Sequence, residues 1–112
     1  MRLEQVGLPG DILLVKLVGP LDIAGANDVE APLNAISEKH NKVIISFAGV
    51  SFLASIGIRV LVKTARAIHK RSGRLVVYGL NDDARKVLRS TGVDSIVPVV
   101  ADEKAAIAEC GK

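Results

Sequence analysis

The sequence predicts an α/β fold: one open, mixed but mostly parallel β-sheet flanked by about four helices, with a β-hairpin at its beginning. Short runs rich in β-branched residues alternate along the 112 residues with longer segments of helical periodicity. The apolar fraction of 49% is mainly aliphatic, with no Trp, one Tyr and two Phe, which is typical of a sheet covered by helices. A chain of this length is expected to form one domain, residues 1–112.

The first third predicts the hairpin and a helix. A strand is expected within residues 1–6, and the run Ile12–Val18 predicts its neighbour, because turn-forming residues separate the two. Residues 19–22 close the second strand. A helix is expected over about 24–39, with Asp22 or a residue near it as N-cap.

The middle of the chain predicts a buried strand over 43–47 and a strongly amphipathic helix over 57–71. One face of this helix is apolar: Ile58, Leu61, Val62, Ala65 and Ile68. The opposite face carries a basic ridge: Arg59, Lys63, Arg66 and Lys70. The Ser-Gly pair at 72–73 is expected to end the helix.

The last third predicts two further strands and two shorter helices. Residues 75–78 indicate a strand and 81–89 a helix with aspartates in its first turn. The segment 96–100 is expected to be extended, and Pro98 favours an edge position because it lacks an N–H group. A final helix is expected over 102–109.

Composition excludes several classes of protein. Fifteen basic against twelve acidic residues give a net charge of +3, a small surplus for nucleic-acid binding when aromatic residues are so few. The single cysteine, Cys110, cannot form an internal disulfide, which suits a reducing compartment. No apolar run is long enough to span a bilayer, and residues 1–5 lack the charged-then-apolar order with which a signal peptide begins. We therefore expect a cytoplasmic protein with no membrane insertion.

Ser55 is the main candidate for a functional residue. It lies where the apolar run 50–53 meets the amphipathic helix, after the central strand, and open α/β sheets place functional residues beyond the carboxyl ends of their strands. At a helix N-terminus, unpaired N–H groups and the helix dipole favour a phosphate, so Ser55 can be a phosphate acceptor. The structural alternative is an N-cap.

The residues around Ser55 also have two interpretations each. Ile56 is either an exposed apolar contact for a partner or part of the core. Gly57 either lets another backbone or a nucleotide phosphate approach closely or serves a tight turn. Asp22 can lie near Ser55 and bind a partner or a metal, although capping of the first helix is favoured. The basic ridge, including Arg59 and Lys63, is either a solvated face or a docking surface for an acidic partner.

Motifs for catalysis and cofactor binding are missing from the sequence. His40 and His69 have no metal-ligand or triad spacing, and the glycine-rich phosphate loops do not occur. Cys110, close to the end of the chain where fraying is expected, is not a good nucleophile. We therefore expect no enzyme activity, no cofactor and no metal.

Three motifs resemble the STAS domain family. Gly19-Pro20-Leu21-Asp22 is similar to the family's motif at the end of the opening hairpin, and residues 43–50 are similar to its central strand and following loop. Residues 52–58 resemble its phosphorylation loop, with Ser55 at the position of the phosphorylated serine. Three residues depart from the common pattern: Ser46 and Ala54 stand where Asp is usual, and Ile56 where a second Ser or Thr is usual.

The resemblance implies an anti-sigma factor antagonist. Such a protein binds an anti-sigma factor that is also a serine kinase, an ATPase of histidine-kinase-like fold, and thereby releases a sigma factor. Phosphorylation of Ser55 switches binding off, and a serine phosphatase restores it. Together, the resemblance and the basic ridge predict partner binding by Asp22, Ala54, Ser55, Ile56, Gly57, Arg59 and Lys63.

Two other functions remain open from the sequence. One is a constitutive STAS scaffold or accessory subunit of a stress-signalling or lipid-transport complex, which Ala54 and Ile56 favour. The other is a small flavodoxin-like enzyme or nucleotide-binding module, against which the missing phosphate loop and acid/base pair argue.

Overall fold

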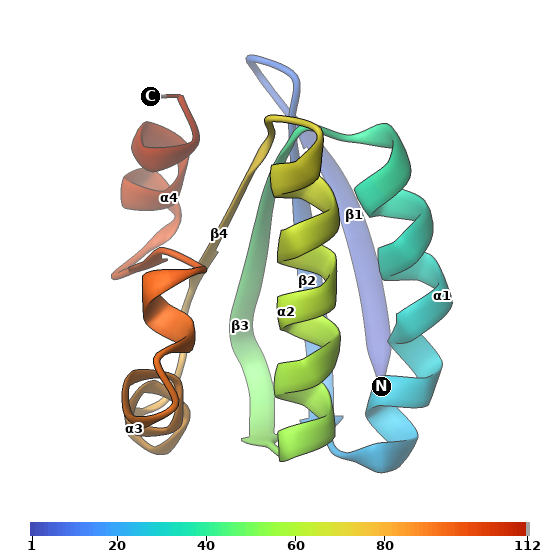
Figure 1. Cartoon of the computed structure of the whole chain (residues 1–112), viewed down its shortest axis with the longest axis vertical. Coiled ribbons are helices and arrows are strands. Elements are labelled where there is room, and N and C mark those ends of the chain that lie inside the picture. Colours follow the sequence, from blue (N-terminus) through green and yellow to red (C-terminus); the bar gives the residue numbers. More distant parts are fainter. Residues whose placement is uncertain (112) are drawn as a thin grey trace.

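The computed structural model describes residues 1–111 and has the predicted α/β architecture (Figure 1). Along the chain the elements are β1 (Arg2–Leu8), β2 (Ile12–Leu21), α1 (Ile23–Lys39), β3 (Lys42–Leu53), α2 (Ser55–Lys70), β4 (Arg74–Tyr78), α3 (Asp82–Ser90), a 3-10 turn η1 (Val93–Ser95), β5 (Val99–Val100) and α4 (Glu103–Cys110). The sheet order is β1-β2-β3-β4-β5 across these residues. The first pair is antiparallel and the other pairs are parallel, so the predicted sheet is confirmed.

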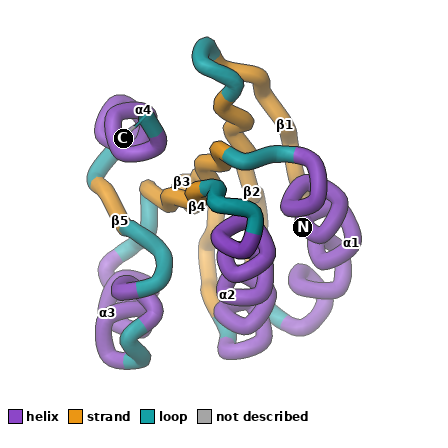
Figure 2. The backbone as a smooth tube through the Cα atoms, turned by 45° about the horizontal axis from the view of Figure 1, so that its top comes forward, coloured by secondary structure: helices purple, strands orange, loops and turns teal. Residues whose placement is uncertain are grey.

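Helices cover both faces of the sheet. In Figure 1, α1 and α2 lie side by side in front of the strands, and the larger core cluster lies beneath them. On the opposite face, α4 packs against β3 and β4, as the turned view of Figure 2 shows. A smaller cluster lies there: Ile12, Leu14, Ile44, Val76, Ala106 and Cys110.

Two strands are longer than the sequence predicts. The second strand was expected to end at Val18 and the central strand at Phe47, but they continue together as far as the pair Leu21 and Leu53. Two register shifts interrupt their pairing, each with an additional residue on β3. A bulge breaks the alternation of buried and exposed residues along a strand. The part of the strand beyond the bulge therefore resembles a loop when only the sequence pattern is considered.

The remaining boundaries differ in small ways. The expected helix over 57–71 begins two residues earlier, at Ser55, and ends at Lys70. Part of the expected extended segment 96–100 is irregular, and only Val99–Val100 pairs as β5. That strand lies at the edge of the sheet, which confirms the position inferred from Pro98.

Candidate functional site

The candidate site lies at the carboxyl edge of the sheet, where β2 and β3 end in register. Leu21 pairs with Leu53, the last residue of β3, and the following residue, Ala54, donates its backbone N–H to the Leu21 carbonyl at 3.0 Å. Asp22 follows one strand and Ser55 the other, so the structure places both beside the same pair of strand ends. The hydrogen bond fixes the direction in which the chain leaves β3 and enters α2.

Ser55 is the first residue of α2 and is exposed. Ala54 occupies the N-cap position and provides no side-chain cap, so the alternative interpretation of Ser55 as an N-cap is wrong. The Ala54 carbonyl accepts from the N–H groups of Gly57 at 2.9 Å and Ile58 at 3.2 Å. Within residues 1–111 the N–H groups of Ser55 and Ile56 have no such acceptor. The hydroxyl therefore stands beside two open donors at the positive end of a helix.

The first turn of α2 also lacks negative charge. None of its residues is acidic, whereas α3 has Asp82 and Asp83 in its first turn and α4 has Glu103. An anion at Ser55 would thus face the helix dipole without like-charge repulsion from its own turn.

Gly57 is buried and is required by close packing. A Cβ atom there would lie 2.5 Å from Leu21 Cγ and 2.9 Å from the Leu21 carbonyl oxygen. The close approach is therefore made by this chain's own β2 strand. Gly57 shapes the candidate surface from beneath and contributes little to it directly.

Ile56 and Asp22 have structural contacts of their own. Ile56 is half-buried and packs against the larger core, so most of its side chain belongs to the core and only part of it is exposed to a partner. Asp22 caps α1 by accepting the Gly25 N–H on Oδ1 at 2.8 Å, as predicted. Asp22 as a whole is half-buried at the strand ends.

The basic ridge is exposed along α2, as the sequence predicts. Lys63 Nζ lies 3.6 Å from Glu30 Oε2 on α1, and both side chains are about half exposed. Among residues 1–111, the other three members have no carboxylate within ion-pair distance. Arg59 lies one helical turn from Ser55 and is the member closest to it along the helix.

Two exposed apolar side chains flank this edge and were missed by the sequence analysis. Phe52, near the end of β3, is 57% exposed, and Ile23, the first residue of α1, is 71% exposed. The bulges on β3 hide the orientation of Phe52 from pattern reading. Ile23 could have been suspected, because it directly follows the N-cap Asp22 and precedes the first buried residue of α1, Gly25.

Cys110 is buried on the other face of the sheet, next to the beginning of β3. Its side chain is 1% exposed in the smaller core cluster, and its thiol contacts the Val43 carbonyl at 3.7 Å. The expectation of a fraying end is therefore wrong for this residue. Burial raises the pKa of the Cys110 thiol, while Arg74 and Lys42 partly oppose the increase, so a reactive thiolate is disfavoured.

The STAS domain family profile matches residues 5–106. The chain belongs to the STAS family. It is 31% identical over 109 residues to the "Putative anti-sigma factor antagonist BtrV" of Bordetella bronchiseptica, with 96% of this chain and 93% of that protein covered. This identity over nearly the whole length makes the chain a STAS domain of the anti-sigma factor antagonist type.

Solved structures share this fold. An anti-sigma factor antagonist from Mycobacterium paratuberculosis superposes with a TM-score of 0.85 at 20% identity, covering 99% of this STAS domain and 96% of that chain. The Bacillus cell fate determinant SpoIIAA in its phosphorylated form gives a TM-score of 0.75 at 20% identity, covering 96% and 98%. Within residues 1–111 no helix has the length and hydropathy to cross a bilayer, and no group of three His, Cys, Asp or Glu side chains could hold a metal ion.

Proposed function

We propose that this STAS domain is a phosphorylation-controlled anti-sigma factor antagonist of the cytoplasm. In its unphosphorylated form it binds an anti-sigma factor that is also a serine kinase, an ATPase of histidine-kinase-like fold, and frees a sigma factor. That kinase transfers phosphate from ATP to Ser55, and a serine phosphatase removes it. The domain acts as ligand and substrate, without catalysis of its own.

The observation that carries this proposal is the position of Ser55. Its hydroxyl is exposed at the first residue of α2, next to open backbone donors, in a STAS domain of the anti-sigma factor antagonist type. A kinase can reach such a hydroxyl without unfolding the domain. The exposed Phe52 and Ile23 near the same edge supply the apolar surface that a protein partner covers.

Phosphorylation changes the interface and leaves the fold intact. A phosphoserine carries about −1.5 to −2 charges at pH 7, which the N-terminus of α2 accommodates. A partner that covers Ser55 must remove water from this charge without a prepared counter-charge, which costs several kcal/mol. Each 1.4 kcal/mol is about tenfold in affinity, so the complex is weakened by orders of magnitude.

The proposal is tested with the wild type, Ser55→Ala and Ser55→Glu as baits in a lysate of the native cell, with mass spectrometry of the captured proteins and of Ser55. We expect a kinase-like anti-sigma factor on the first two baits, its loss on the third, and phosphate on Ser55 of the wild type. Equal capture of a non-kinase partner by all three baits contradicts the switch and favours a constitutive scaffold.

A further inference from the structure

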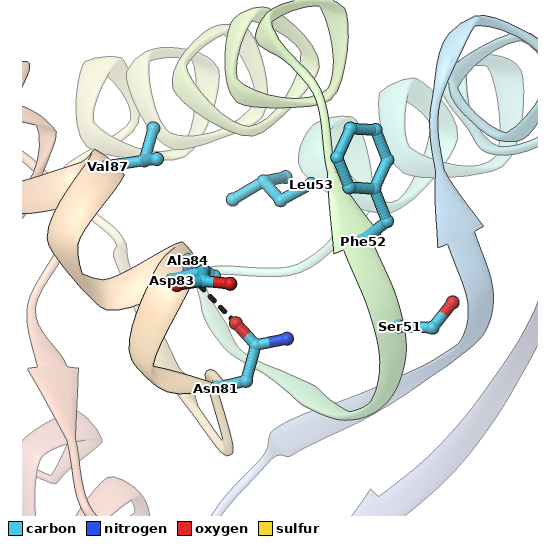
Figure 3. Close-up of a pocket in the computed structure, with 7 residues that line it drawn as sticks. All are labelled: Ser51, Phe52, Leu53, Asn81, Asp83, Ala84 and Val87. Carbon is cyan, nitrogen blue, oxygen red and sulfur yellow. Dashed lines mark hydrogen bonds between the residues drawn. The ribbon is translucent and has the colours of Figure 1, made fainter.

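A groove runs between the end of β3 and α3. Strand β4 pairs with β3 only from Lys42 to Ser46, so the following part of β3 has a strand neighbour on the β2 side alone. The chain leaves β4 at Gly79, which has φ +81° and lies so close to β3 that a Cβ would be 2.8 Å from the Ala48 nitrogen. Helix α3 then lies beside the free end of β3 (Figure 3).

Most of the side chains that line the groove are apolar. Its volume is about 140 Å³, and it is lined by Ser51, Phe52, Leu53, Asn81, Asp83, Ala84 and Val87. In Figure 3, Leu53 extends from β3 toward α3, the helix that carries Ala84 and Val87. An adjoining hollow shares Phe52, Leu53 and Ala84 with the groove and is also lined by the apolar side chains of Phe47, Val50 and Leu80. An apolar cavity of about 150 Å³ holds a benzene-sized molecule, so this groove has room for one aliphatic side chain.

Asp83 gives the rim a negative charge. It is the one charged side chain among the lining residues and is exposed. Within residues 1–111 it forms no ion pair. Asn81 also lines the groove, but its Oδ1 already accepts the Ala84 N–H at 2.8 Å as the N-cap of α3. An apolar hollow with one carboxylate at its edge suits an apolar group that has a cation next to it.

We propose that this groove receives an aliphatic side chain of the protein partner that is adjacent to a lysine or arginine. The aliphatic group lies against Leu53 and Val87, and the cation lies beside Asp83. This inference rests on the proposed function, because the groove is continuous with the partner surface: Leu53, in its wall, is followed directly by Ala54 and Ser55.

The groove therefore gives the partner a contact that does not require the Ser55 hydroxyl. Phosphate on Ser55 blocks the surface beside it, while the groove keeps its shape and charge. Specificity for one anti-sigma factor among several then depends on Phe52, Asp83 and Val87, and the switch depends on Ser55.

The chemistry of the groove can be tested on the isolated protein by NMR titration. The probes share one branched chain and differ in charge: 4-methylpentylammonium, 4-methylpentan-1-ol and 4-methylpentanoate. We expect shift changes confined to the amides of residues 51–53 and 80–87. At low salt the affinity should fall from ammonium to alcohol to carboxylate, by about two- to fivefold between the first two, as for an exposed charge pair.

Asp82→Asn is the matched control for Asp83→Asn, because both aspartates are exposed in the first turn of α3 and only Asp83 lines the groove. Asp83→Asn should remove the preference for the ammonium probe, and Asp82→Asn should keep it. Shift changes spread over the surface, the same affinity for all three probes, or equal effects of the two variants overturn the proposal.

The partner is tested with Phe52→Ala against Ile107→Ala, which removes another exposed apolar side chain from α4. Phe52→Ala should weaken binding of the captured anti-sigma factor about tenfold or more, and Ile107→Ala should not change it. Equal effects overturn the groove as a docking site. Ser55→Glu should leave probe binding within about twofold. The two proposals therefore fail in different ways. If the phosphorylation switch is wrong, Ser55→Glu keeps its partner; if the groove is not a docking site, the probe titration and Phe52→Ala give the contradicting results described above.

Discussion

Ser55→Glu should stabilise the isolated domain slightly, although the proposed switch predicts that the same substitution abolishes partner binding. The substitution puts a carboxylate at the first residue of α2, a helix with no acidic residue in its first turn and no side-chain cap. An anion at a helix N-terminus contributes about 0.3–1 kcal/mol. With an unfolding entropy of about 2.1 cal/mol/K per residue, 1 kcal/mol corresponds to about 4 °C in a domain of this size. The melting temperature should therefore rise by about 1–4 °C.

The measurement is thermal unfolding by circular dichroism of the wild type, Ser55→Glu and the neutral control Ser55→Gln. The difference in melting temperature between the Glu and Gln variants isolates the effect of the charge. It should shrink in 1 M salt, where the Debye length is about 3 Å. A Glu variant that melts several degrees below the Gln variant, or a difference unaffected by salt, would refute the argument that the N-terminus of α2 accepts an anion.

Two further predictions concern the support of the site. Gly57→Ala should lower the melting temperature by up to about 8 °C, because the clash with Leu21 costs up to about 3 kcal/mol and alanine's helix propensity returns only about 1 kcal/mol. Gly7→Ala is the control, since no atom lies within 4 Å of its Cβ position, and equal losses in the two variants would contradict the packing argument. Burial raises the pKa of the Cys110 thiol above its ordinary value of 9.0, so the thiol ionises in the unfolded chain before it ionises in the folded protein as the pH rises. The buried neutral thiol therefore contributes fully to the free energy of unfolding below about pH 9, and this contribution is lost as the pH rises through the pKa of the folded state. Denaturant unfolding from pH 7 to 10.5 should show a downward slope in the wild type that Cys110→Ala lacks; parallel curves would contradict it.

Much of the fold could be predicted from local patterns in the sequence. Alternating strand and helix patterns predicted the element order, and Pro98 predicted the edge strand. The basic ridge and the apolar face of α2 followed from helical periodicity, and the Asp22 cap from its place before the first helix. These features depend on residues that are close together in the chain.

The site was predictable only in part. Ser55 could be found because it lies at a strand–helix boundary. Its place as the first residue of the helix could not, because it depends on the hydrogen bond from the Ala54 N–H to the Leu21 carbonyl, which joins the ends of two neighbouring strands. Gly57 had two interpretations, and contact with Leu21, distant in sequence, decided between them. The orientation of Phe52 depends on bulges whose register is set by pairing with β2.

The sequence by itself determined the α/β class, the order of the elements, the amphipathic character of α2 and the position of Ser55 at the boundary between a strand and that helix. Periodicity and capping act over a few residues, so they can be read along the chain. Only the tertiary structure decided how far β2 and β3 run together, which residue Gly57 contacts, and that β3 and α3 enclose a groove with Asp83 at its rim. These properties arise from contacts between segments far apart in sequence, which no local pattern specifies.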